Sequence, residues 1–126
     1  MPRVSLFAPM RKSLLAALVI LGAAGSAVAG DGQAGEAFVT NQGDSTVSVV
    51  DLETLKVLET INVGGNPAGV AVSGDRAQVF VTAPETKELV VIDAGTRRIA
   101  KRVKVGAGPL GIAAHPTNGR VYVADW

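Results

Sequence analysis

The chain has 126 residues, enough for at most one ordinary domain. Hydrophobic residues make up 48% of it but aromatic residues only 4%, so a core must be built mainly from Val, Ile, Leu and Ala. The sequence has no cysteine, which excludes disulfides, thiolate metal sites and a catalytic cysteine.

Residues 1–29 have the features of a secretory signal peptide. Arg11 and Lys12 precede an apolar run over 14–24, and the small residues of 27–29 suit a signal peptidase. The stretch 14–29 is shorter than the ~20 residues that a membrane-spanning helix needs. We therefore predict cleavage after Ala29 and no membrane span in the mature chain. Translation from Met1 and translation from a second methionine at position 10 both stay open.

Cleavage would change the sign of the net charge. It removes Arg3, Arg11 and Lys12 but no acidic residue, so the formal charge of +1 becomes −2. This balance does not favour a general nucleic-acid-binding protein. Residues 30–36, with the sequence GDGQAGE, are predicted to form a flexible lead-in.

One short phrase recurs at a constant interval of 42 residues. It reads AFVTN at 37–41, VFVTA at 79–83 and VYVAD at 121–125. An ungapped alignment of 37–78 with 79–120 gives 11 identities in 42 positions, where roughly two or three are expected by chance. The chain from residue 37 is therefore a repeat array, with units at 37–78 and 79–120 and the start of a third at 121–126.

Each unit contains four short runs rich in Val and Ile, separated by turn signals. This pattern predicts an all-β fold: a β-propeller of four-stranded antiparallel blades with a 42-residue repeat, of which about two blades are present. The inner strand A is placed at 68–73 and 110–115, strand B at 37–41, 79–83 and 121–125, strand C at 46–51 and 88–93, and strand D at 56–63 and 98–105. On this assignment there are nine strands, and the first repeat lacks its inner strand.

The phrases AFVTN, VSVVD and INVGGNPAGVAV, with their counterparts in the second unit, resemble the YVTN family of bacterial and archaeal β-propeller repeats. The resemblance covers 37–126. It implies a longer chain, and seven such blades with the leader would make roughly 330 residues. We expect residues 30–126 alone to aggregate or to fold poorly, because repeat units need neighbours to bury a continuous core.

Several polar and small residues are predicted to be structural. Asp and Thr recur three apart at the connection from strand C to strand D, where an Asp side chain binds backbone N–H groups and fixes a turn. Small residues suit the inner strand, because blades converge at the centre of a propeller. The residues assigned these structural roles are Asp51, Thr54, Asp93, Thr96, Gly69 and Gly111.

Two further features invite a functional interpretation. His115 is the only histidine, with no second metal-ligating residue nearby, so we favour a turn position and predict no metal and no cofactor. The basic run RRIAKRVK at 97–104 lies on an outer strand. Protection of an exposed edge explains it better than binding of an anionic polymer.

The connections from D to A and from B to C should share one face of a propeller. The glycine-containing stretches 64–66 and 106–108 are no phosphate loop, because no helix follows them. We take this face as the candidate site for an unknown protein or small-molecule ligand. Its candidate binding residues are Asn41, Gln42, Asp44, Asn66, Asp125 and Trp126.

The sequence thus predicts an exported, non-catalytic β-propeller for binding or scaffolding, found in the periplasm or outside the cell. No catalytic residue is assigned. One alternative, implied by the resemblance, is a periplasmic propeller that assists a redox system, either by holding haem or beside a quinone-dependent dehydrogenase. Another is a propeller lyase or lactonase, which would need acid–base or metal residues at the mouth of the channel.

Overall fold

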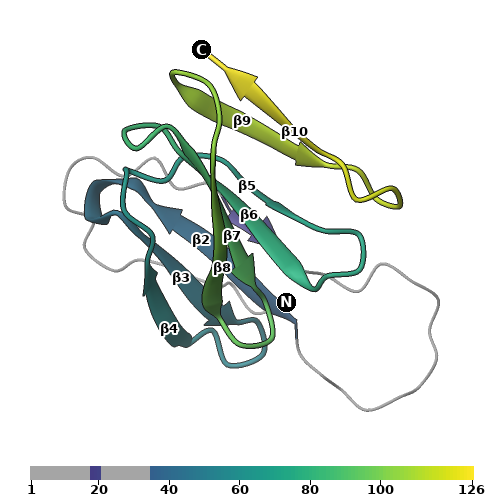
Figure 1. Ribbon diagram of the computed structural model, residues 1–126. Coiled ribbons are helices and arrows are strands. Elements are labelled where there is room, and N and C mark those ends of the chain that lie inside the picture. Colours follow the sequence, from purple (N-terminus) through teal and green to yellow (C-terminus); the bar gives the residue numbers. More distant parts are fainter. Residues whose placement is uncertain (1–17, 21–34) are drawn as a thin grey trace.

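The computed structural model describes residues 18–20 and 35–126, and this part of the chain is built from β-strands (Figure 1). A single 3₁₀ turn, Gln42–Asp44, interrupts them in the described part. The strands are β1 (Leu18–Ile20), β2 (Glu36–Asn41), β3 (Thr46–Asp51), β4 (Val57–Asn62), β5 (Val70–Val72), β6 (Gln78–Ala83), β7 (Glu88–Asp93), β8 (Arg98–Lys104), β9 (Pro109–Ala114) and β10 (Val121–Asp125).

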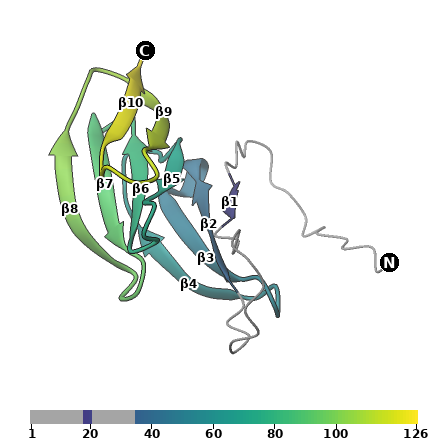
Figure 2. The ribbon, with the colours of Figure 1, turned by 90° about the vertical axis from the view of Figure 1, so that its right-hand side faces the viewer.

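These strands form three antiparallel sheets that follow one another in the chain. Their strand orders are β1-β2-β3-β4, β5-β6-β7-β8 and β9-β10. The sheets lie side by side with β4 and β8 at their outer edges, as successive propeller blades do (Figure 2). The predicted fold class, a partial β-propeller of four-stranded blades, is confirmed.

The 42-residue repeat of the sequence is also a repeat of strand pairing. Phe38 lies opposite Val49 in the first sheet, and Phe80 lies opposite Val91 in the second. Both sheets carry an irregularity in the same place, where β3 pairs with β4 and where β7 pairs with β8. The predicted B and C strands match the observed ones to within one residue.

The first sheet contains a strand that the sequence analysis did not place. β1, from the apolar part of the predicted signal peptide, pairs with β2 so that Leu18 lies opposite Val39. β5 holds the equivalent position against β6, with Val70 opposite Val81. The expectation of three strands in this sheet and nine in total was therefore wrong.

The physical reason lies in the inner edge of β2. Without a neighbour, that edge would leave backbone N–H and C=O groups unpaired, and a short extended segment satisfies them. The rest of the predicted signal peptide and residues 30–34 of the lead-in lie outside the described residues. Residue 36, the last of the predicted lead-in, is the first residue of β2.

The main core fills the space between the first two sheets. Phe38 and Val49 of the first sheet are fully buried, as are Val90 and Ile92 of β7 in the second. A smaller cluster lies on the other side of the second sheet, where Phe80, Leu89 and Val91 pack towards β9 and β10. All four apolar residues of β7 are therefore buried, because this strand is covered on both faces.

Neighbouring inner strands approach each other closely. A Cβ atom at Gly69 would lie 2.3 Å from the carbonyl oxygen of Leu110, nearer than packed atoms come. A residue without a side chain is thus needed at position 69, just before β5, where the chain meets β9. Further out, the guanidinium of Arg97 forms an ion pair with Glu36, which joins the first two sheets across their outer part.

Candidate functional site: the loop face

The antiparallel strand order places the connections of each blade at two opposite faces. The B–C connections at 42–45 and 84–87 share one face with the D–A connections at 63–69 and 105–108. We call this the loop face. The backbone N–H of Glu85 donates to the carbonyl oxygen of Gly65 at 3.2 Å, so the loops of neighbouring blades are in direct contact there.

Asn66 links three of these loops. It adopts a left-handed backbone with φ of 52°, a conformation that Asn tolerates better than most residues. Its Oδ1 accepts a hydrogen bond from Ser45 Oγ at 2.9 Å, and its Nδ2 donates to Glu85. The structure therefore places this predicted binding residue in a bridge between the loops of two blades.

Two other candidate residues are also engaged in holding loops. Asn41 donates from Nδ2 to the hydroxyl groups of Thr46 and Ser48, at 3.0 and 2.8 Å, within the first blade. The carboxylate of Asp125 accepts hydrogen bonds from the backbone N–H groups of Ala107, at 3.0 Å, and of Gly108, at 2.7 Å. Asp125 thereby fixes the connection between the second and third blades.

The remaining candidates lie at the surface of the loop face. Asp44 is exposed and Gln42 half-exposed, both on the 3₁₀ turn. Trp126 is 93% exposed, and its backbone N–H donates to Gly108 at 3.0 Å. The side chains left for an external ligand are thus Gln42, Asp44 and Trp126, set on loops that the other three residues hold in place.

Sequence reasoning missed Ser45 and Glu85, which complete the bridge through Asn66. The repeat gave no signal for Ser45, because the aligned residue in the second unit is Lys87. Both residues of this aligned pair have a positive φ, of 57° and 58°. The shared feature is a backbone conformation, which the side-chain types do not reveal.

The opposite face carries the C–D turns with the recurring aspartates. Thr54 Oγ1 donates to Asp51 at 2.7 Å and the N–H of Glu53 donates at 2.9 Å, and these bonds lower the pKa of Asp51. In the second blade, the backbone N–H and the hydroxyl of Thr96 lower the pKa of Asp93 in the same way. A general acid at neutral pH needs a raised pKa. The pKa of both carboxylates is lowered instead, so they suit turn formation better than acid catalysis.

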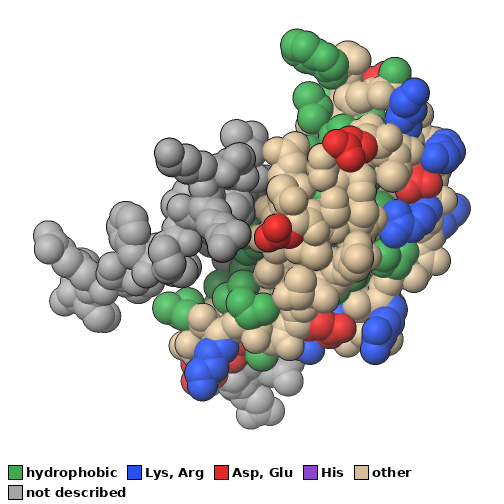
Figure 3. Space-filling view, turned by 90° about the vertical axis from the view of Figure 1, so that its left-hand side faces the viewer, with side chains coloured by type: hydrophobic (Ala, Val, Ile, Leu, Met, Phe, Trp, Pro, Cys, Tyr) green, Lys and Arg blue, Asp and Glu red, His purple; other side chains and the backbone are tan. Residues whose placement is uncertain are grey.

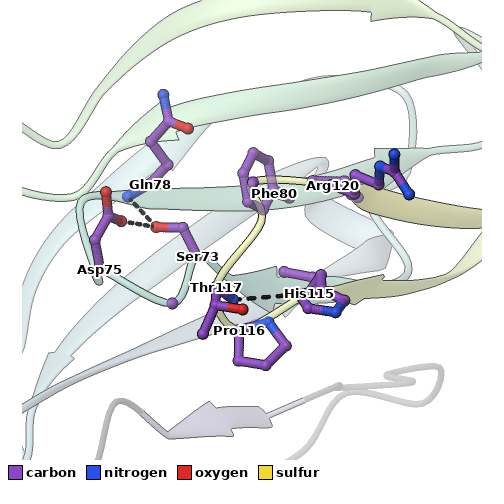
Figure 4. Close-up of a pocket in the computed structure, with 12 residues that line it drawn as sticks. Ser73, Asp75, Gln78, Phe80, His115, Pro116, Thr117 and Arg120 are labelled. Atoms are coloured by element: carbon purple, nitrogen blue, oxygen red, sulfur yellow. Dashed lines mark hydrogen bonds between the residues drawn. The ribbon is translucent and has the colours of Figure 1, made fainter.

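A cavity of about 190 Å³ opens on this opposite face, between two A–B turns (Figure 4). Ser73 and Asp75 line one side of it, and they are hydrogen-bonded to each other at 2.5 Å. His115 lines the other side, where its Nδ1 accepts the N–H of Thr117 at 3.2 Å. The imidazole therefore holds its own turn.

Within 18–20 and 35–126, no group of three or more His, Cys, Asp or Glu is placed to hold a metal ion. The same part of the chain has no helix long and apolar enough to cross a membrane.

Comparison with known proteins identifies the family. Residues 5–119 match the family model described as YNCE-like beta-propeller. The chain belongs to this family. The match agrees with the resemblance to YVTN repeats, and it extends into the predicted signal peptide. No curated protein matches the sequence.

Solved structures show the same fold in longer chains. Kuenenia stuttgartiensis hydrazine synthase matches with a TM-score of 0.68 and 34% identity, over 71% of this chain and 26% of that one. The dihydro-heme d1 dehydrogenase NirN matches with a TM-score of 0.62 and 24% identity, over 71% and 20%. Citrobacter koseri AztD matches at 0.56 and 19%, over 69% and 25%. The chain thus spans about a quarter or less of the length of these proteins.

Proposed function

We propose that this chain is part of an exported β-propeller that binds a protein partner or a small molecule through its loop face, without catalysis by residues of this chain. The observation that carries the proposal is the order of the loop face, where Asn66 bridges the loops of two blades and Asp125 holds the 105–108 connection by two hydrogen bonds. Trp126 follows β10 on the same face, and tryptophan is enriched among the residues that dominate binding energy.

The loop face is suited to binding because its loops are already ordered. Asn66 ties the loops of the first two blades together, so little conformational entropy remains to be lost when a ligand docks. Gln42 and Asp44 add polar groups on the same face. Aromatic contacts supplemented by polar ones are typical of protein interfaces.

The pKa values of three aspartates support the proposal that residues of this chain do not catalyse a reaction. Asp51, Asp75 and Asp93 all have a lowered pKa, in each case through hydrogen bonds made within a turn. Each therefore stabilises a local backbone conformation and stays ionised at neutral pH. Export draws its support from the predicted signal peptide alone. Cleavage after Ala29 would remove β1, so the inner edge of β2 would then need another strand.

Site-specific photo-crosslinking in the native host would test the proposal. A benzoyl-phenylalanine at position 126 replaces one large aromatic side chain by another, and the same group at Thr117 reports on the opposite, exposed A–B turn. We expect irradiation to give a discrete crosslinked product from position 126 and none from position 117. Products from position 117 alone would place the partner on the wrong face.

A redox role is the second candidate, and the similarity to hydrazine synthase favours it. That protein matches with 34% identity, and a second match is to the dihydro-heme d1 dehydrogenase NirN. The chain offers neither of two common axial ligands of haem iron, because its one histidine holds a turn and it has no cysteine. In this role the propeller would dock a redox protein through the loop face.

A visible absorption spectrum of the natural full-length protein tests whether the propeller itself holds haem. Binding without redox chemistry predicts no band above 350 nm, since amino-acid side chains do not absorb there. A haem band that shifts on reduction would favour the redox role. The experiment uses the complete protein, because other blades can supply ligands that this chain lacks.

A further inference from the structure

We propose that the outer edge of β8 is a docking edge for an extended acidic peptide, which adds to the second blade as a fifth strand. This inference concerns a surface away from the loop face and does not depend on the proposed function. β8 lies at the end of its sheet, paired only with β7. Every second residue along its free side therefore presents unpaired N–H and C=O groups, the template for an added strand.

The charge of this strand is strongly positive. Arg98, Lys101, Arg102 and Lys104 lie along it with exposed side chains, over a length of about 20 Å. Lys and Arg side chains gather along one margin of the molecule, on the side of the outer strands (Figure 3). The equivalent residues of the first blade are Lys56, Glu59, Thr60 and Asn62. The row of cations is therefore a property of the second blade and not of the repeat.

Few acidic residues of the chain neutralise this row. Glu88 is shared by two of the cations, at 3.2 Å from both Arg102 and Lys104. Asp93, which lies opposite Arg98 in the sheet, is occupied by hydrogen bonds from Thr96. Within the described part of the chain, no ion pair engages Arg98 or Lys101. An excess of positive charge thus remains for an external anion.

The pairing register shows how this charge is distributed. Arg98 and Lys101 lie opposite Asp93 and Val91, so they point to one face of the sheet. Arg102 and Lys104 lie opposite Val90 and Glu88, so they point to the other face. A strand that pairs with this edge would meet cations on both of its faces. Its complement is a strand with Asp or Glu residues on both of its faces and not an alternating amphipathic strand.

The competing explanation is that the cations only protect the edge from pairing with another sheet. The two explanations differ in whether the edge also attracts a partner. Lys and Arg on an edge repel a second copy of the same edge. The same field attracts an acidic strand, whose backbone also satisfies the unpaired N–H and C=O groups. A polyanion without a peptide backbone would use the charges only. The peptide is therefore the occupant that uses both properties of this edge.

Fluorescence anisotropy with the natural full-length protein tests the proposal. The probe is a fluorescein-labelled peptide of Thr-Glu-Glu repeated three times, and the comparison probe has the same sequence with alternate backbone nitrogens methylated. The protein variant R98Q/K101Q is matched by K56Q/R76Q, which removes two exposed positive charges elsewhere. We expect Kd to rise about tenfold for R98Q/K101Q and less than twofold for K56Q/R76Q, since each exposed charge contributes modestly.

The methylated peptide and inorganic polyphosphate identify the type of ligand. Loss of binding on methylation, with polyphosphate a weak competitor, would support strand addition. Equal binding of the methylated peptide, or displacement by polyphosphate at the lower concentration, would overturn it in favour of nonspecific attraction. No measurable binding of the Thr-Glu-Glu peptide, or equal Kd for both double variants, would leave edge protection as the whole explanation.

Discussion

The hydroxyl of Thr82 donates a hydrogen bond of 2.8 Å to the carbonyl oxygen of Leu110, across the joint between the second and third blades. Thr82 is fully buried, and its Oγ1 also accepts the N–H of Gly69 at 2.8 Å. The equivalent bond between the first two blades joins Thr40 to the carbonyl oxygen of Ala68 at 3.1 Å. The threonine of the recurring phrase is therefore an inter-blade contact.

Replacing Thr82 with Val should destabilise the protein by about 1–3 kcal/mol, because it removes the hydrogen bonds to the N–H of Gly69 and to the C=O of Leu110. Urea denaturation of the full-length protein measures this loss. Thr82→Ser keeps the hydroxyl and should retain more of the stability than Val does. A Val variant as stable as wild type, or a Ser variant less stable than Val, would contradict the proposed contact.

Substitution of Gly74 should also weaken the joint between blades. An added Cβ would lie 1.6 Å from the carbonyl oxygen of Pro116, so the two A–B turns would have to separate. We expect Gly74→Ala to cost roughly 1–3 kcal/mol, as overpacking does. Gly95→Ala is the control, since the nearest atom to its Cβ would be 3.5 Å away. Its effect on the free energy of unfolding, measured by urea denaturation, should be within about 0.5 kcal/mol.

The Asp51 carboxyl should titrate below its ordinary pKa of 3.8, chiefly because Thr54 donates a hydrogen bond to it. Its depressed pKa stabilises the fold above the unfolded-state pKa, and this stability is lost as pH falls through the folded-state pKa. NMR titration of Thr54→Val should show the Asp51 pKa moving up towards 3.8. An unchanged pKa would mean that the hydroxyl has no part in the shift.

The strands of the repeat could be predicted because each of them occurs more than once. Comparison of 37–78 with 79–120 locates β2 and β3, with β6 and β7, to within one residue. β1 could not be predicted, since its place depends on the free edge of β2 and its sequence reads as a signal peptide. An apolar run of that length does not reveal which edge it pairs with.

The sequence predicted the face on which the candidate site lies, but not the contacts within that site. Strand order alone brings the B–C and D–A connections together, so Asn66 and Trp126 were assigned to the same face. The bonds from Asn66 to Ser45 and Glu85 span 21 and 19 residues and have no counterpart in the repeat alignment. They arise from how one blade stacks on the next, which the pattern of a single unit does not contain.

Labelling of single cysteines in living cells tests the central claim, an exported propeller occupied at its loop face, most directly. The sequence has no cysteine, so Asp44→Cys on the loop face and Thr117→Cys on the opposite face each introduce one thiol at an exposed position. The reagent is a charged maleimide that does not cross the cytoplasmic membrane. We predict that both variants react in intact cells, and that Asp44→Cys reacts several-fold more slowly there than in purified protein, while Thr117→Cys reacts at the same rate in both. Absence of labelling at both positions in intact cells, or slowing at Thr117→Cys alone, would contradict the account.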